Sequence, residues 1–147
     1  MGQYHYVVNK TKRQFINPHK MGDGLKLLEF GCSTNGTMTA LAVLLAKDNG
    51  LGGGDLHFEH ELIGSWVGDN IEIAGDYGDG TMSRPALDKK EGMLNLHEYA
   101  EEYYEDISWR IREVICQDKW IAKEIGKPWT DRSEWPDSVK KRYPGGP

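Results

Sequence analysis

Glycine is concentrated in the first 92 residues of this 147-residue chain, which favours short elements of secondary structure joined by turns. The chain contains 18 glycines, and most of them precede residue 93. Each glycine weakens a helix or strand and favours a turn. We therefore expect turns, short strands and short helices in this part of the chain, and longer helix after it.

Four runs in the glycine-rich part have the composition of strands. Residues 4–9 and 14–17 are rich in aromatic and β-branched side chains, and Pro18 ends the second run. Residues 62–67 and 70–74 flank Gly68-Asp69, a pair typical of a tight hairpin turn. The spacing predicts two hairpins, with Ile71 and Ile73 on one face of the second.

Two helices are expected. Residues 37–47 are apolar on nearly every side, which indicates a buried helix. Asn95 with Glu98 matches a helix-capping pattern. After this cap, apolar residues recur every three or four positions, at Leu96, Tyr99, Tyr103, Ile107, Ile111 and Val114. This period predicts a longer amphipathic helix over about 95–117, with a continuation to 125 left open.

These elements predict an α+β fold, in which a small, largely antiparallel sheet packs against both helices. The length is typical of one domain, so residues 1–147 are expected to form a single domain. From about residue 127 the chain is rich in aromatic residues and contains several prolines. We expect an irregular tail there.

The chain lacks the signatures of secreted and membrane proteins. Its two cysteines, Cys32 and Cys116, are far apart and form no Cys-x-x-Cys pair. No basic start followed by an apolar run is present, and the longest apolar run, residues 38–46, is less than half a membrane span. The sequence predicts a cytoplasmic protein that does not enter a membrane.

The net charge of −5 is unevenly distributed along the chain. Residues 48–118 carry five basic and seventeen acidic side chains, whereas both ends of the chain are basic. An acidic protein without a known reader motif is repelled by phosphates, which disfavours nucleic acid as a partner. The asymmetry can steer a protein partner, and it is also what an ordinary solvated surface would give.

A small-residue loop before the 37–47 helix is the first candidate site. Its residues are Gly31, Cys32, Ser33, Asn35, Gly36 and Thr37. With the preceding Leu28-Glu29-Phe30 it resembles the first motif of Rossmann-like methyltransferases, which implies a site for S-adenosylmethionine or a nucleotide. Ser33 stands where that motif has its middle glycine. A tight turn leading into a core helix is the alternative, and the chance frequency of short glycine patterns favours it.

Two histidines and a group of aromatic residues are further candidates. His57 and His60 could ligate a metal, but no third ligand is recognisable from the spacing, so no cofactor is expected. Tyr104, Trp109 and Trp120 fall away from the centre of the apolar stripe of the 95–117 helix. Exposed aromatic side chains are typical of binding surfaces, so these three predict a protein partner or self-association. The tail could instead cover them.

Two segments carry a resemblance that covers most of the chain: Met1-Gly2-Gln3-Tyr4-His5-Tyr6-Val7-Val8-Asn9 and Asn17-Pro18-His19-Lys20-Met21-Gly22-Asp23-Gly24-Leu25-Lys26-Leu27-Leu28-Glu29-Phe30-Gly31. They resemble small uncharacterised proteins of bacteria and bacteriophages, a family without an assigned activity. The resemblance implies a host cytoplasm as the location if the chain is phage-encoded, and it transfers no site.

The sequence holds no complete catalytic constellation. We therefore expect a binding or interaction protein, acting on a host factor if phage-encoded. The alternative is a small enzyme or ligand-binding protein that uses the Gly31–Gly36 loop.

Overall fold

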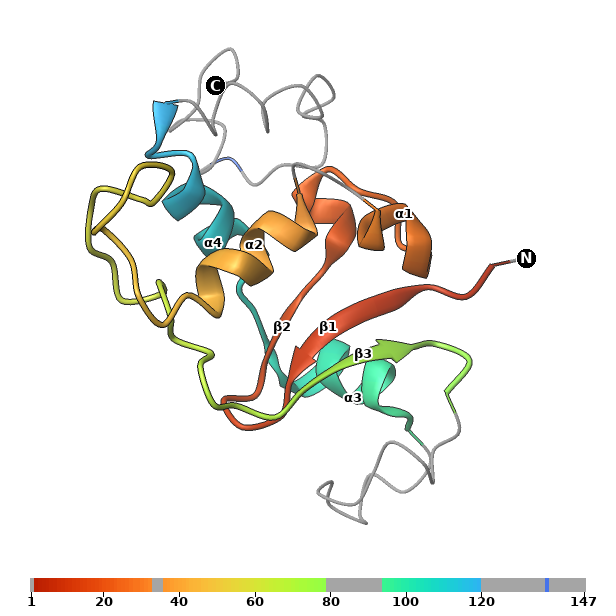
Figure 1. Ribbon diagram of the computed structural model, residues 1–147. Coiled ribbons are helices and arrows are strands. Elements are labelled where there is room, and N and C mark those ends of the chain that lie inside the picture. The colour runs from red at the N-terminus through yellow and green to blue at the C-terminus, as the bar shows by residue number, and fades with distance from the viewer. Residues whose placement is uncertain (1, 33–35, 79–93, 120–136, 138–147) are drawn as a thin grey trace.

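A small mixed sheet lies at the centre of the computed structural model (Figure 1). The residues that the structure describes are 2–32, 36–78, 94–119 and 137. The strands are β1 (His5–Asn9), β2 (Gln14–Ile16), β3 (Ile71–Gly75) and β4 (Glu105–Asp106), in the spatial order β3-β1-β2-β4. β1 pairs antiparallel with β2 and with β3, whereas β2 and β4 are parallel. The predicted α+β class is confirmed, and the parallel β4 makes the sheet mixed.

Helices cover both faces of the sheet (Figure 1). They are the 3-10 helix η1 (Pro18–Met21) and the α-helices α1 (Leu27–Gly31), α2 (Thr37–Leu44), α3 (Leu96–Tyr103) and α4 (Ser108–Ile115). α3 packs on one face, and α2 and α4 pack on the other. In the described part of the chain, no helix has the length and apolar character needed to cross a membrane.

The alternation of side chains along β1 creates two separate hydrophobic cores. Successive residues of a strand point to opposite faces, so Val7 belongs to one core and its neighbours Tyr6 and Val8 to the other. The larger core lies under α2 and α4, and the smaller core lies under α3. β1 is therefore paired on both edges and buried on both faces.

The helix predicted at 37–47 is confirmed as α2, although α2 ends earlier, at Leu44. Ala40, Val43 and Leu44 are buried, while Met38 remains 40% exposed. The helix therefore has one buried side rather than being enclosed all round, because it packs at the outside of the larger core.

The hairpin predicted from residues 62–67 and 70–74 is wrong in its first half. β3 forms from the second run, but it pairs with β1, and residues 61–68 form successive turns. Gly64 has φ +73° and lies against the Ala46 carbonyl at the end of α2. These turns place Trp66, which is fully buried, in the larger core, where its Nε1–H donates to Gln14 Oε1 at 2.9 Å.

The single helix predicted over 95–117 is also wrong, because it is divided into α3 and α4. Tyr104 adopts extended backbone angles, φ −95° and ψ 159°, and ends α3. The next two residues form β4, and α4 then ends at Ile115. The continuation from 120 to 125 and the tail from 127 lie outside the described residues, except for Asp137.

Strand pairing is the physical reason for this break. The Glu105 N–H donates to the Arg13 carbonyl, and the Ile107 N–H donates to the Phe15 carbonyl, both at 3.0 Å. These hydrogen bonds replace the helical ones that the same residues would otherwise make. As a result the chain passes around the β2 side of the sheet, and α3 and α4 lie on opposite faces.

Candidate functional site

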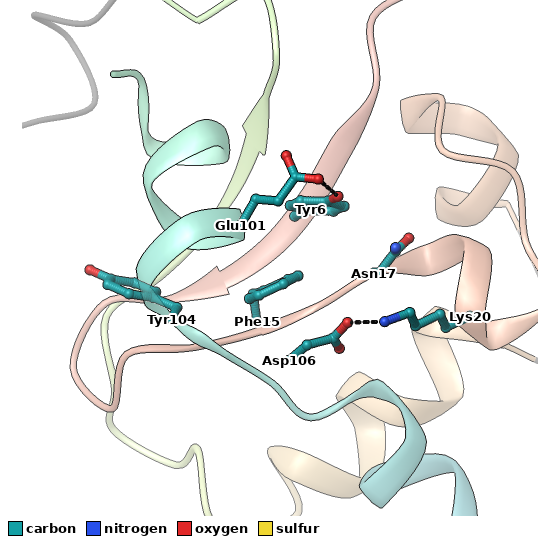
Figure 2. Close-up of a pocket in the computed structure, with 7 residues that line it drawn as sticks. All are labelled: Tyr6, Phe15, Asn17, Lys20, Glu101, Tyr104 and Asp106. Atoms are coloured by element: carbon teal, nitrogen blue, oxygen red, sulfur yellow. Dashed lines mark hydrogen bonds and ion pairs between the residues drawn. The ribbon is translucent and has the colours of Figure 1, made fainter. Parts of the chain in front are cut away.

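A cleft of about 290 Å³ lies on the α3 side of the sheet. Figure 2 shows the residues that line it: Tyr6, Phe15, Asn17, Lys20, Glu101, Tyr104 and Asp106. They come from β1, β2, η1, α3 and β4 and the residues that adjoin these elements, and thus from both ends of the described chain. The volume suits one amino-acid side chain or a small molecule.

The aromatic wall of the cleft follows from the register of the sheet. Val8 of β1 pairs with Phe15 of β2, so Tyr6 and Phe15 project from the same face. Their ring centroids are 4.8 Å apart. Tyr104, at the end of α3, adds a third ring, which is itself held edge-on by Tyr99 at 5.8 Å. Tyr6 and Phe15 are nearly buried, at 7% and 4% exposed, so Tyr104 is the ring that lies most open to the cleft.

A network of hydrogen bonds fixes the polar side of the cleft. Lys20 Nζ donates to Asp106 Oδ2 at 2.6 Å, and the Ser108 hydroxyl donates to Asp106 Oδ1 at 2.5 Å. The same hydroxyl accepts from the Asn17 N–H at 2.8 Å. The Asn17 side chain caps η1 by accepting from the His19 N–H. These contacts connect η1 to β4 and to the start of α4.

Tyr6 and Glu101 form the opposite side of the cleft. The Tyr6 hydroxyl donates to Glu101 Oε1 at 3.2 Å. Burial raises the pKa of Tyr6 well above its usual range, and the negative charge of Glu101 raises it further. The phenol is therefore neutral at physiological pH, which suits a hydrogen-bond donor rather than a base. His97 stacks on the other side of the Tyr6 ring, with centroids 4.0 Å apart.

The glycine loop predicted as a ligand site is only partly described, because Ser33 and Asn35 lie outside the described residues. Gly31 ends α1, and Cys32 is exposed. Residues 28–30, which would form a strand in a methyltransferase motif, belong to helix α1. At Thr37 the backbone N–H of the α2 N-terminus already donates to Asp23 Oδ2 at 2.7 Å. This carboxylate occupies the position that an anionic ligand would take.

The two histidines predicted as metal ligands, His57 and His60, lie in different surroundings. His57 is exposed, and His60 is half-buried with its Nδ1 accepting from the Leu62 N–H at 3.1 Å. Among the residues that the structure describes, no three His, Cys, Asp or Glu side chains come together as a metal site. His60 lines an open hollow with Lys47, Asn49 and two glutamates that flank it in sequence.

Two of the three aromatic residues predicted as an interaction surface, Tyr104 and Trp109, lie on opposite sides of the sheet. Tyr104 packs against the smaller core and lines the cleft, whereas Trp109 packs against the larger core on the other side of the sheet. Trp120 lies outside the described residues. Sequence reasoning thus found one cleft residue, Tyr104.

Most of the cleft was missed because its residues meet only through the fold. Lys20 and Asp106 are 86 residues apart in the sequence, and Tyr6 and Glu101 are 95 apart. The one local signal was Asn17-Pro18, which starts a helical turn and places Lys20. No protein-family model, curated protein or solved structure matches the chain. The chemistry of the cleft is therefore the guide to function.

Proposed function

We propose that this chain is a binding protein that recognises a partner protein through the cleft between α3 and η1. The observation that carries the proposal is the composition of the cleft: three aromatic rings and two hydrogen-bonded carboxylates line a half-open space of about one side chain. Aromatic side chains around a partly desolvated pocket are typical of the anchor points of protein interfaces.

The preorganisation of the cleft supports a role in binding. Lys20, Asp106 and Ser108 hold one another through short hydrogen bonds, and Tyr6 holds Glu101. A partner's side chain would meet groups that are already oriented, so less conformational entropy is lost on association. A partly buried site with fixed walls gives specificity even when the contact area is small.

Two features indicate what kind of protein the partner is: the charge of the chain, and its resemblance to proteins of bacteria and bacteriophages. The acidic middle of the chain includes α3 and β4, which line the cleft. This charge would accelerate association with a basic surface. The chain resembles proteins of bacteria and bacteriophages, and if it is phage-encoded the proposed partner is a host protein. The enzyme or nucleotide-binding alternative at residues 31–37 has less support, because Asp23 occupies the α2 N-terminus at Thr37.

Selection of peptides from a random display library tests the proposal. We expect selected peptides to bind the wild-type protein and to shift NMR resonances of the cleft. Replacing Tyr104 by alanine removes an aromatic wall, so affinity should fall by about tenfold or more, the cost of a typical hot-spot residue. Tyr103→Ala is the matched control, because Tyr103 is 48% exposed and does not line the cleft. Equal losses in both variants, or binding elsewhere, would contradict the proposal.

A further inference from the structure

We infer that the cleft is a receptor for a guanidinium group, the side chain of an arginine on the partner. The inference rests on the proposed function, because it specifies which side chain occupies the proposed cleft. It follows from the charges that face the cleft and from the shape of its aromatic walls.

The charged groups that line the cleft leave one negative charge uncompensated. Lys20 and Asp106 neutralise each other as a pair at 2.6 Å. Glu101 receives only the neutral Tyr6 hydroxyl, through its Oε1 atom. Within the described part of the chain, Glu101 Oε2 has no hydrogen-bond donor and forms no ion pair. A cationic ligand would complete this site, whereas a phosphate would be repelled by Glu101.

The surrounding sequence strengthens the same field. Residues 94–109, which contain α3 and β4, include no lysine or arginine. Their acidic residues are Glu98, Glu101, Glu102, Glu105 and Asp106, of which Glu105 is paired with Arg110 and Asp106 with Lys20. Glu98, Glu101 and Glu102 therefore supply the net negative charge. A cation that approaches this side of the molecule is therefore attracted before it makes any contact.

The aromatic walls favour a planar cation over a compact one. In Figure 2 the Phe15 ring lies between the Tyr6–Glu101 pair and the Lys20–Asp106 pair, and Tyr104 lies apart from them at the end of α3. The Tyr6 and Phe15 rings pack on each other and are only 7% and 4% exposed, so the ring most open to a ligand is that of the half-buried Tyr104. A guanidinium group can stack on a ring face while its N–H groups point sideways to a carboxylate. An ammonium group is more strongly hydrated and lacks a flat face, so lysine should bind more weakly.

Blocked pentapeptides that differ only at their central residue provide the test. The residues compared are arginine, lysine and citrulline, since citrulline keeps the shape of arginine without its charge. NMR titration should show the arginine peptide shifting cleft resonances with a dissociation constant on the order of 1 mM, as expected for a single anchoring side chain. We expect the citrulline peptide to bind at least about tenfold more weakly, with lysine between the two.

Two adjacent glutamates on α3 give a matched pair of variants. Glu101→Gln removes the uncompensated charge in the cleft, and Glu102→Gln removes the same charge from an exposed position outside it. Both are isosteric changes at exposed positions, so both proteins should fold. We expect Glu101→Gln to weaken the arginine peptide by about fivefold or more, and Glu102→Gln to change its affinity less than about twofold.

The outcomes separate this inference from the proposed function. Equal affinity for the arginine and citrulline peptides, or equal effects of Glu101→Gln and Glu102→Gln, would overturn the guanidinium assignment. If display-selected peptides bound the cleft without an arginine, the assignment would fail while the proposed function stood. If no peptide bound the cleft, both would fail.

Discussion

At the scale of single residues, His97 is the most unusual side chain in the described part of the molecule. It is only 7% exposed, and its two ring nitrogens have no hydrogen-bond partner among the described residues. Burial lowers the pKa of His97 below the usual 6.5, although the nearby charges of Glu101, Asp76 and Glu98 oppose this effect and His5 adds to it. The neutral ring that stacks on Tyr6 is thus the form that the fold accommodates.

The lowered pKa of His97 predicts how the stability of the protein depends on pH. Because the folded state binds the proton of His97 less well than the unfolded state does, the unfolded chain takes up more protons as the pH falls. The contribution of His97 to stability is therefore present above about pH 6.5 and is lost on acidification below it. Urea unfolding over a series of pH values should show a smaller decline for His97→Phe than for the wild type. His57→Gln, at an exposed position, should leave the decline unchanged. A His97→Phe profile parallel to the wild type would contradict the assignment.

Asp106 allows a second prediction at this scale. Its carboxylate accepts from Lys20 Nζ and from both the N–H and the hydroxyl of Ser108. Asp106→Ala leaves these donors without their acceptor, so we expect a loss of about 2–3 kcal/mol in the free energy of unfolding. Asp106→Asn retains an oxygen for Ser108 and should cost about 1 kcal/mol. Chemical denaturation measures both, and equal losses would show that the Ser108 bonds contribute little.

At the scale of elements, the turns at residues 61–68 show how the tertiary fold overrides a strand-like pattern. Leu62 and Trp66 are buried, while Val67 is 42% exposed, so the buried positions are four apart and not two. The Gly64 N–H donates to the Val43 carbonyl, and the Trp66 N–H donates to the Leu44 carbonyl at the end of α2. The segment thus satisfies the last carbonyl groups of a helix rather than those of a strand.

Two glycines in this segment form a matched test. Gly64 and Gly68 both have positive φ, +73° and +81°, but only at Gly64 would a Cβ atom come within 2.5 Å of a backbone oxygen, that of Ala46. Gly68→Ala should cost about 1–2 kcal/mol, the strain of the left-handed conformation alone. Gly64→Ala adds a backbone clash, so its cost should be larger, about 3 kcal/mol or more. Thermal unfolding of the two variants checks the order, and a smaller loss for Gly64→Ala would contradict it.

The division of the predicted long helix shows what the sequence can and cannot reveal. The capping pattern at Asn95 is confirmed, since its side chain accepts from the Glu98 N–H. The stripe residues from Leu96 to Val114 are buried apart from Tyr103, which is 48% exposed. Their spacing stays in phase with a helix across Tyr104, so the period gives no sign of the break. The break depends on backbone groups of Arg13 and Phe15, about 90 residues earlier, which no local pattern contains.

At the scale of the whole molecule, the sheet acts as a partition between two hydrophobic cores. The local strands β1 and β2 and the helix α2 were predictable, because composition and period are properties of neighbouring residues. The cleft was not, because Tyr6, Lys20 and Glu101 converge only when α3 is placed on the β1–β2 face. Local chemistry therefore predicted the elements, whereas the site follows from their order in space.

The position of Trp109 on one side of the sheet predicts that this residue contributes to stability. This residue packs against the larger core, so Trp109→Ala should lower the free energy of unfolding by about 2–4 kcal/mol. Analytical ultracentrifugation of the same variant tests the predicted role of Trp109 in self-association. An unchanged molecular mass with reduced stability would assign Trp109 to the fold, whereas a shift from dimer to monomer with unchanged stability would assign it to an interface.

The double burial of β1 has a consequence for synthesis on the ribosome. β1 can pair with β2 soon after both emerge, but its other edge waits for β3 and one of its faces waits for α3, about 65 and 90 residues later in the chain. At roughly 5–20 residues per second, this interval lasts from several seconds to almost twenty. During that time the nascent chain carries a strand with an open edge and an apolar face, the kind of segment that chaperones bind. The strand that is most protected in the finished molecule is thus among the most vulnerable while the molecule is being made.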